Sequence, residues 1–136
     1  MKVPSFIGGA VLFTVLGPLS AAAFAAGPQG GFAPVPLANW QAKNAVSALD
    51  LARPLTQSFP ESLEGRQGLS IRLGKRGGSE IVIDVTRTGL LDDSVTADMH
   101  RIVARQASGG WETTSVGVKR KCARNRNAGW TTSTCK

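Results

Sequence analysis

The chain has 136 residues, a net charge of +7 at pH 7, one histidine, two cysteines and no tyrosine. This length suits one compact domain, and the supply of cysteine and histidine excludes a zinc site with four such ligands. Residues 26–112 carry nine basic and nine acidic side chains, whereas the last 24 residues carry six basic side chains and no acidic one. Any electrostatic function therefore belongs to the C-terminal end.

The first 25 residues have the layout of a secretory signal peptide. One charge, at Lys2, precedes an uncharged apolar run, and Ala23-Phe24-Ala25 fits the small-x-small rule for cleavage after Ala25. An uncleaved membrane anchor is the alternative, because about 20 apolar residues span a bilayer. The breaker pair Gly17-Pro18 favours cleavage, and no cysteine is present there for a lipid anchor. We expect no transmembrane segment after cleavage.

The region after the signal peptide is expected to be a flexible leader followed by the main helix. Residues 26–36 are rich in glycine and proline, which resist helix and sheet alike. From Leu37 to Arg53, apolar residues recur at three- and four-residue spacings, which predicts an amphipathic helix. Asn39 is the expected N-cap, and Pro54 is expected to end the helix because it lacks a backbone donor. A second short helix is expected over residues 55–65, followed by a turn at residues 66–68.

The next segments alternate between apolar and polar residues. Residues 69–73 and 81–85 have the period of two that is typical of strands, and the glycine-rich residues 74–78 between them predict a hairpin. Residues 88–94 form the expected connection to residues 95–106, which suit either a helix capped by Ser94 or a strand. We favour a strand from Met99 to Gln106, because a turn at residues 108–110 and a threonine- and valine-rich segment follow.

These elements predict an α+β domain over residues 37–136. One main N-terminal helix would pack on an antiparallel sheet of about four strands, with a C-terminal loop closed by a disulfide. Export supports the disulfide, because such bonds persist in oxidising compartments. With two cysteines, Cys122 and Cys135, only one intramolecular pair exists.

The sequence offers little raw material for catalysis, and we expect neither an enzyme nor a cofactor. His100 could act as a base with Asp92, Asp93 or Asp98, giving a small hydrolase, but no activated-nucleophile pattern accompanies it. The list of weaker motifs is short: Asp84 and Glu112 as a carboxylate pair, Asp92-Asp93 as a calcium site, and residues 74–78 as a phosphate loop. The expected roles of the last two are a turn start and a hairpin tip, and no metal is expected.

The C-terminal segment combines charge, aromatic surface and a closed loop. Cations beside an indole suit anionic groups, so an anionic envelope polymer, a lipid headgroup or an acidic protein is the expected partner, and no specific nucleic acid is predicted. Solubility alone is the competing explanation for the charge. The expected contact residues are Lys119, Arg120, Lys121, Arg124, Arg126 and Trp130.

The order of Trp111, Gly117, Cys122, Trp130 and Cys135, with basic residues around the first cysteine, resembles the C-terminal ends of small exported bacterial proteins. The resemblance covers only about the last 45 residues. It implies a hairpin that leads into a disulfide loop and a periplasmic or secreted bacterial protein, and it carries over no catalytic residue.

We therefore expect an exported, non-enzymatic envelope protein that binds an anion through its cationic C-terminal loop. The alternative is a structural subunit or inhibitor that docks on a partner protein. In that case Trp111, Trp130 or a sheet edge would make the contact, since aromatic residues often dominate interfaces.

Overall fold

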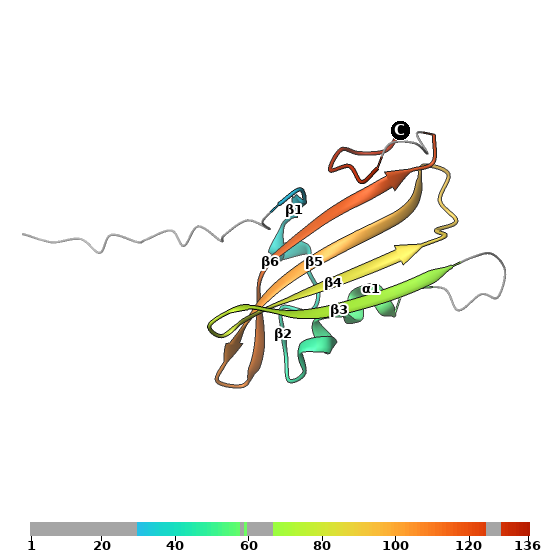
Figure 1. The fold of residues 1–136 in the computed structure, drawn as a ribbon. Coiled ribbons are helices and arrows are strands. Elements are labelled where there is room, and N and C mark those ends of the chain that lie inside the picture. The colour runs from blue at the N-terminus through green and yellow to red at the C-terminus, as the bar shows by residue number, and fades with distance from the viewer. Residues whose placement is uncertain (1–29, 58, 60–66, 125–128) are drawn as a thin grey trace, which may run out of the picture.

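The protein is a single twisted antiparallel sheet with a short helical segment on one face (Figure 1). The computed structural model describes residues 30–57, 59, 67–124 and 129–136. Six strands lie in the order β1-β6-β5-β4-β3, with β2 also paired to β6. The elements are β1 (Ala33–Val35), η1 (Leu37–Asn39), β2 (Asn44–Ala45), η2 (Ala48–Ala52), α1 (Arg53–Thr56), β3 (Gly68–Gly77), β4 (Glu80–Thr88), β5 (Val95–Ala107) and β6 (Gly110–Cys122).

The expected α+β fold, with one main helix on about four strands, is wrong. Within the described part of the chain, helical structure is limited to η1, η2 and α1, and β2 interrupts the segment expected to form the main helix. The reason is tertiary pairing. Asn44 and Ala45 pair with Glu112 and Trp111 of β6, and the N–H of Thr113 donates to a carbonyl of the same segment. Backbone groups that a helix would have used are bonded to β6 instead.

The two residues expected to bound that helix have other roles. Asn39 is the last residue of η1, so it is not the N-cap of a long helix. Pro54 lies in the first turn of α1. Backbone N–H groups in the first turn have no partner within the helix, so a proline there costs no helical hydrogen bond. The expected signal peptide and residues 60–65 of the expected second helix lie outside the described residues.

The expected flexible leader is also wrong where the structure describes it. Ala33–Val35 form β1, an edge strand that pairs antiparallel with residues 116–118 of β6. Proline is tolerated there, because one side of an edge strand makes no ladder hydrogen bonds. Phe32, just before β1, is buried. The leader thus contributes one strand and one buried aromatic ring to the domain.

The later strand predictions are confirmed. β3 and β4 form the expected antiparallel hairpin, with its turn at Gly78 and Ser79. The strand preferred over a helix for residues 99–106 is part of β5, which begins at Val95, and β6 follows a turn at Ser108 and Gly109. In the connection at residues 89–94, the carboxylate of Asp92 accepts hydrogen bonds from the N–H groups of Ser94 and Val95, at 2.7 and 2.9 Å.

One face of the sheet carries the hydrophobic core. Ile83, Ile102 and Val116 lie side by side across β4, β5 and β6 and are fully buried or nearly so. Leu51 of η2 and Leu55 of α1 pack against them. The short helical segment therefore covers the centre of this face, and we call it the core face. The opposite face of the sheet is called the outer face.

Candidate anion-binding face

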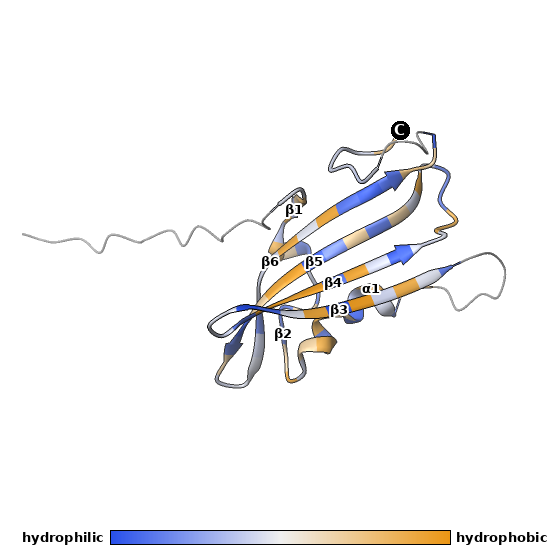
Figure 2. Cartoon of the chain, viewed as in Figure 1, coloured by the Kyte–Doolittle hydropathy of each residue, from blue (hydrophilic) through white to orange (hydrophobic). Residues whose placement is uncertain are grey.

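The basic run at the end of β6 is divided between the two faces of the sheet. Successive side chains of a strand point to opposite sides. Arg120 lies opposite Asp98 on the core face, whereas Lys119 lies opposite Met99 on the outer face, and Lys121 follows on the same side. Figure 2 shows the hydrophilic end of β6 beside the C-terminal loop. Arg120 is thus separated from the two lysines with which the sequence grouped it.

Trp130 lies against the two lysines of the outer face. The ammonium of Lys119 lies 5.4 Å from the centre of the indole ring and that of Lys121 lies 5.1 Å from it. Lys121 is exposed, and Lys119 and Trp130 are half-buried. Neither lysine forms an ion pair with a carboxylate among the described residues. Two unneutralised cations therefore flank one aromatic surface.

A second aromatic ring extends this arrangement across the sheet. Phe32 lies 4.5 Å from the guanidinium carbon of Arg101 and 4.6 Å from the ammonium of Lys119, measured to the ring centre. Gly117 lies between Arg101 and Pro34 in the register of the sheet, so Arg101 has room to reach over β6 to this ring. No sequence pattern marked Phe32 or Arg101, because their approach depends on the pairing of β1 with β6. We call Phe32, Lys119, Lys121 and Trp130 the cation–aromatic cluster.

The C-terminal loop that holds Trp130 is fixed at three points. The expected disulfide between Cys122 and Cys135 is present, with an S–S distance of 2.00 Å. Arg120 and Thr131 exchange two backbone hydrogen bonds of 2.8 Å each. The hydroxyl of Thr131 also accepts a bond from the N–H of Ser133. These constraints limit the positions open to the indole of Trp130. Holding that ring beside the two lysines therefore costs little further conformational entropy.

Removing the disulfide should destabilise the protein and loosen this loop. A loop of this size corresponds to about 3 kcal/mol in the chain-entropy model, so Cys122→Ser with Cys135→Ser should lower the free energy of unfolding by about that amount. Urea denaturation followed by circular dichroism measures the change. Reduced wild-type protein is the control and should match the double variant. An unchanged midpoint would mean that the loop is held without its covalent link.

The remaining predicted contact residues do not all join the cluster. Arg124 is exposed beyond the end of β6, and Trp111 is half-buried and packs against the core. Arg126 lies outside the residues that the structure describes. The cation–aromatic cluster thus retains Lys119, Lys121 and Trp130 from the predicted set, and Arg124 adds an exposed positive charge three residues after Lys121.

Arg120 instead faces a buried polar group on the core face. The guanidinium of Arg87 donates to Asp98, with Nε–Oδ1 at 2.9 Å, and His100 stacks on Trp40 with ring centres 6.2 Å apart. Burial lowers the pKa of His100 to about 4; the carboxylate of Asp98 opposes this shift, while the charges of Arg87 and Arg120 add to it. The imidazole is therefore neutral near pH 7. We call Arg87, Asp98 and His100 the buried polar group.

This geometry does not favour the hydrolase alternative. The Nδ1 atom of His100 is 3.8 Å from Asp98, too far for a hydrogen bond, and Asp98 is already bonded to Arg87. Asp92 is occupied by the backbone donors of the β4–β5 connection, as expected for a turn start. No group of three or more metal-ligating side chains occurs within the described ranges.

The other weak motifs are also engaged elsewhere. Asp84 binds Arg101 through two bonds of 2.8 Å, and Glu112 binds Arg105 at 2.8 Å, so the two carboxylates belong to separate ion pairs. The glycine-rich residues 74–78 end β3 and form the hairpin tip. This is the structural role expected for them.

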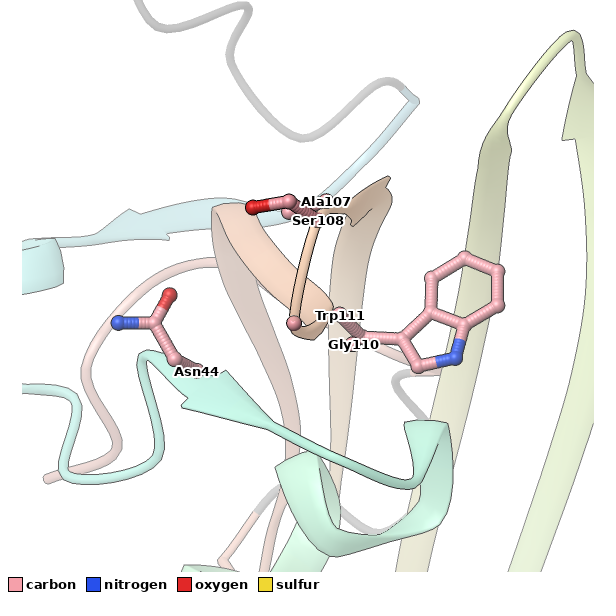
Figure 3. A pocket seen from close by; sticks show the side chains of 6 residues that line it. Asn44, Ala107, Ser108, Gly110 and Trp111 are labelled. Atoms are coloured by element: carbon pink, nitrogen blue, oxygen red, sulfur yellow. The ribbon is translucent and has the colours of Figure 1, made fainter.

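A hollow at the tip of the β5–β6 hairpin offers little chemistry. Its lining has no charged side chain, and the indole of Trp111 points away from Asn44 (Figure 3). The lining residues are Asn44, Ala107, Ser108, Gly109, Gly110 and Trp111. The hollow is therefore a poorer candidate for a binding site than the cation–aromatic cluster.

Among the described residues, no helix has the length and apolar character needed to cross a membrane. Comparison of the chain with family models, with curated proteins and with solved structures gives no significant match.

Proposed function

We propose that the chain is an exported, non-enzymatic envelope protein that binds an anionic surface through its outer face. Lys121 and Arg124 supply exposed positive charge, Lys119 supplies a half-buried charge, and Trp130 supplies an amphipathic ring. The observation that carries the proposal is the position of the two ammonium groups at 5.4 and 5.1 Å from the same indole, with no carboxylate partner among the described residues.

Phosphate groups displayed at high density fit this arrangement best. Lysine binds phosphate as a point charge, and tryptophan favours the boundary between apolar and aqueous regions. Lipid headgroups and lipopolysaccharide both display such phosphates. The export signal expected from the sequence would bring the protein to these surfaces. The energy of attraction is about 1 kcal/mol for each basic residue near an anionic membrane.

Charge reversal provides the test. Lys121→Glu with Arg124→Glu should weaken binding to phosphatidylglycerol vesicles by at least about thirtyfold, because two attractive charges of about 1 kcal/mol each are lost. Vesicle co-sedimentation at low and high salt measures the affinity. Wild-type binding should weaken steeply with salt, as ions screen the attraction. A parallel measurement with purified lipopolysaccharide distinguishes the two sources of phosphate.

A matched control separates a site from net charge. Lys75→Glu with Arg76→Glu makes the same change in charge at the tip of the β3–β4 hairpin, at the end of the sheet opposite to the end where the C-terminal loop lies (Figure 1). This variant should retain binding within a few fold. Equal losses for both double variants, or no binding of the wild type at low salt, would contradict the proposal.

A further inference from the structure

The two edges of the sheet differ in how far their backbone groups are paired. The edge of β6 that faces away from β5 is covered along its length. β1 pairs with residues 116–118, β2 pairs with residues 111–112, and Thr131 bridges to Arg120. At the opposite edge, β3 runs for ten residues and pairs with β4 alone among the described strands. Alternate backbone donors and acceptors of an edge strand point away from the sheet. Among the described residues, β3 therefore presents a row of backbone groups that no second strand pairs.

The apolar side chains of β3 extend the core face to this edge. Ile71 lies opposite Val85, and Leu73 lies opposite Ile83. Both partners on β4 have no exposed surface, whereas Ile71 and Leu73 are 40% and 55% exposed, and Leu69 is 40% exposed. Apolar residues are visible along β3 in Figure 2. The exposed row would be covered by apolar side chains of one additional strand.

The charge of β3 selects the kind of strand that can be added. The strand has three basic residues, Arg72, Lys75 and Arg76, and no acidic residue. Arg72 lies opposite Asp84, but that carboxylate binds Arg101 through both oxygens. Within the described part of the chain, no ion pair neutralises Arg72, Lys75 or Arg76. A second copy of β3 would bring like charges together, which disfavours pairing, whereas an acidic strand would find complementary charge.

We propose that the edge of β3 from Leu69 to Lys75 pairs with an extended segment of a partner protein in which apolar and acidic residues alternate. Apolar residues of that segment would lie beside Leu69, Ile71 and Leu73, and its carboxylates would lie beside Arg72. Main-chain hydrogen bonds would provide affinity, and the alternating side chains would provide specificity, as in other complexes formed by strand addition. The proposal is independent of the anion-binding face, because the two surfaces share no residue.

Charge-swapped peptides test this pairing. A fluorescein-labelled peptide Thr-Val-Glu-Val-Glu-Val-Thr should bind the mature protein, and the lysine analogue Thr-Val-Lys-Val-Lys-Val-Thr should bind at least about tenfold more weakly, measured by fluorescence anisotropy. Arg72→Glu should reverse this preference. Methylation of alternate peptide nitrogens should abolish binding when it removes the donors that face β3. The variant Lys121→Glu with Arg124→Glu should bind the glutamate peptide as the wild type does.

Several outcomes would overturn the proposal. Equal affinity for the two peptides, in the wild type or in Arg72→Glu, would remove the charge argument. Binding that survives N-methylation at each of the two sets of alternate nitrogens in turn would remove the strand-pairing argument. Sedimentation that shows a dimer through β3, dispersed by Leu73→Lys, would make a second copy the occupant. Loss of peptide binding on Lys121→Glu with Arg124→Glu would assign the peptide to the anion-binding face instead.

Discussion

Replacing Asp98 by alanine is expected to lower the free energy of unfolding by about 3–5 kcal/mol. Asp98 is 6% exposed, and it binds Arg87 through two hydrogen bonds, one of them 2.9 Å long. Hydrogen bonding to Asp98 raises the pKa of Arg87 against the opposing effect of burial. Without the carboxylate, a positive charge would remain on the core face with little access to water. The cost arises from that uncompensated charge more than from the lost attraction.

Two other ion pairs give a graded control for this effect. The side chains of Arg87 and Asp98 are 18% and 9% exposed, those of Arg101 and Asp84 are 30% and 22% exposed, and those of Arg105 and Glu112 are 58% and 40% exposed. The cost of Asp84→Ala should be intermediate, and that of Glu112→Ala should be about 0–1 kcal/mol. Urea denaturation of each variant measures the series. A loss for Asp98→Ala no greater than that for Glu112→Ala would contradict the argument from burial.

Acidification from pH 6.5 to pH 4 should destabilise the protein by about 3 kcal/mol through His100. The pKa of a histidine is ordinarily about 6.5, and burial lowers that of His100 to about 4 in the folded protein. Between these values the unfolded chain binds more protons than the folded chain. Stability is therefore fully present above pH 6.5, falls as the pH drops through this window, and changes no further through this group well below pH 4.

The variant His100→Phe tests the pH dependence. Phenylalanine can keep the ring contact with Trp40 and removes a buried Nδ1 atom that has no hydrogen-bond partner. We expect the slope of unfolding free energy against pH to flatten between pH 4 and 6.5, with little loss of stability at pH 7. Urea denaturation at half-unit pH steps measures both quantities. An identical slope in the variant and the wild type would mean that His100 is not the group responsible.

The basic residues at the end of β6 show which features of the site a local sequence pattern can predict. The threonine- and valine-rich segment after the turn at residues 108–110 suits a strand, and alternation along such a strand separates Lys119 from Arg120. The position of Trp130 beside Lys119 and Lys121 was not available from that pattern. It depends on the disulfide and on the bridge between Arg120 and Thr131, which bring the end of the chain back along β6.

The sequence by itself predicted the hairpin of β3 and β4, the turn at the end of β5 with the strand after it, and the disulfide, and it favoured a strand for the second half of β5. Period-two alternation and glycine-rich turns are local signals, so they are readable without the rest of the fold. Two cysteines leave one intramolecular pairing, and the expected export favoured a disulfide. The concentration of positive charge at the C-terminal end is likewise a property of the composition alone.

Only the tertiary structure decided what the first part of the domain becomes. The spacing of apolar residues from Leu37 to Arg53 fits a helix, yet the hydroxyl of Thr113 donates to the carbonyl of Ala42 across 71 positions of the chain. The same edge of β6 recruits Ala33–Val35. Free donors and acceptors on an edge strand stabilise any nearby segment that pairs with them. That long-range contact outweighs a weak local helix preference, and sequence periodicity carries no information about it.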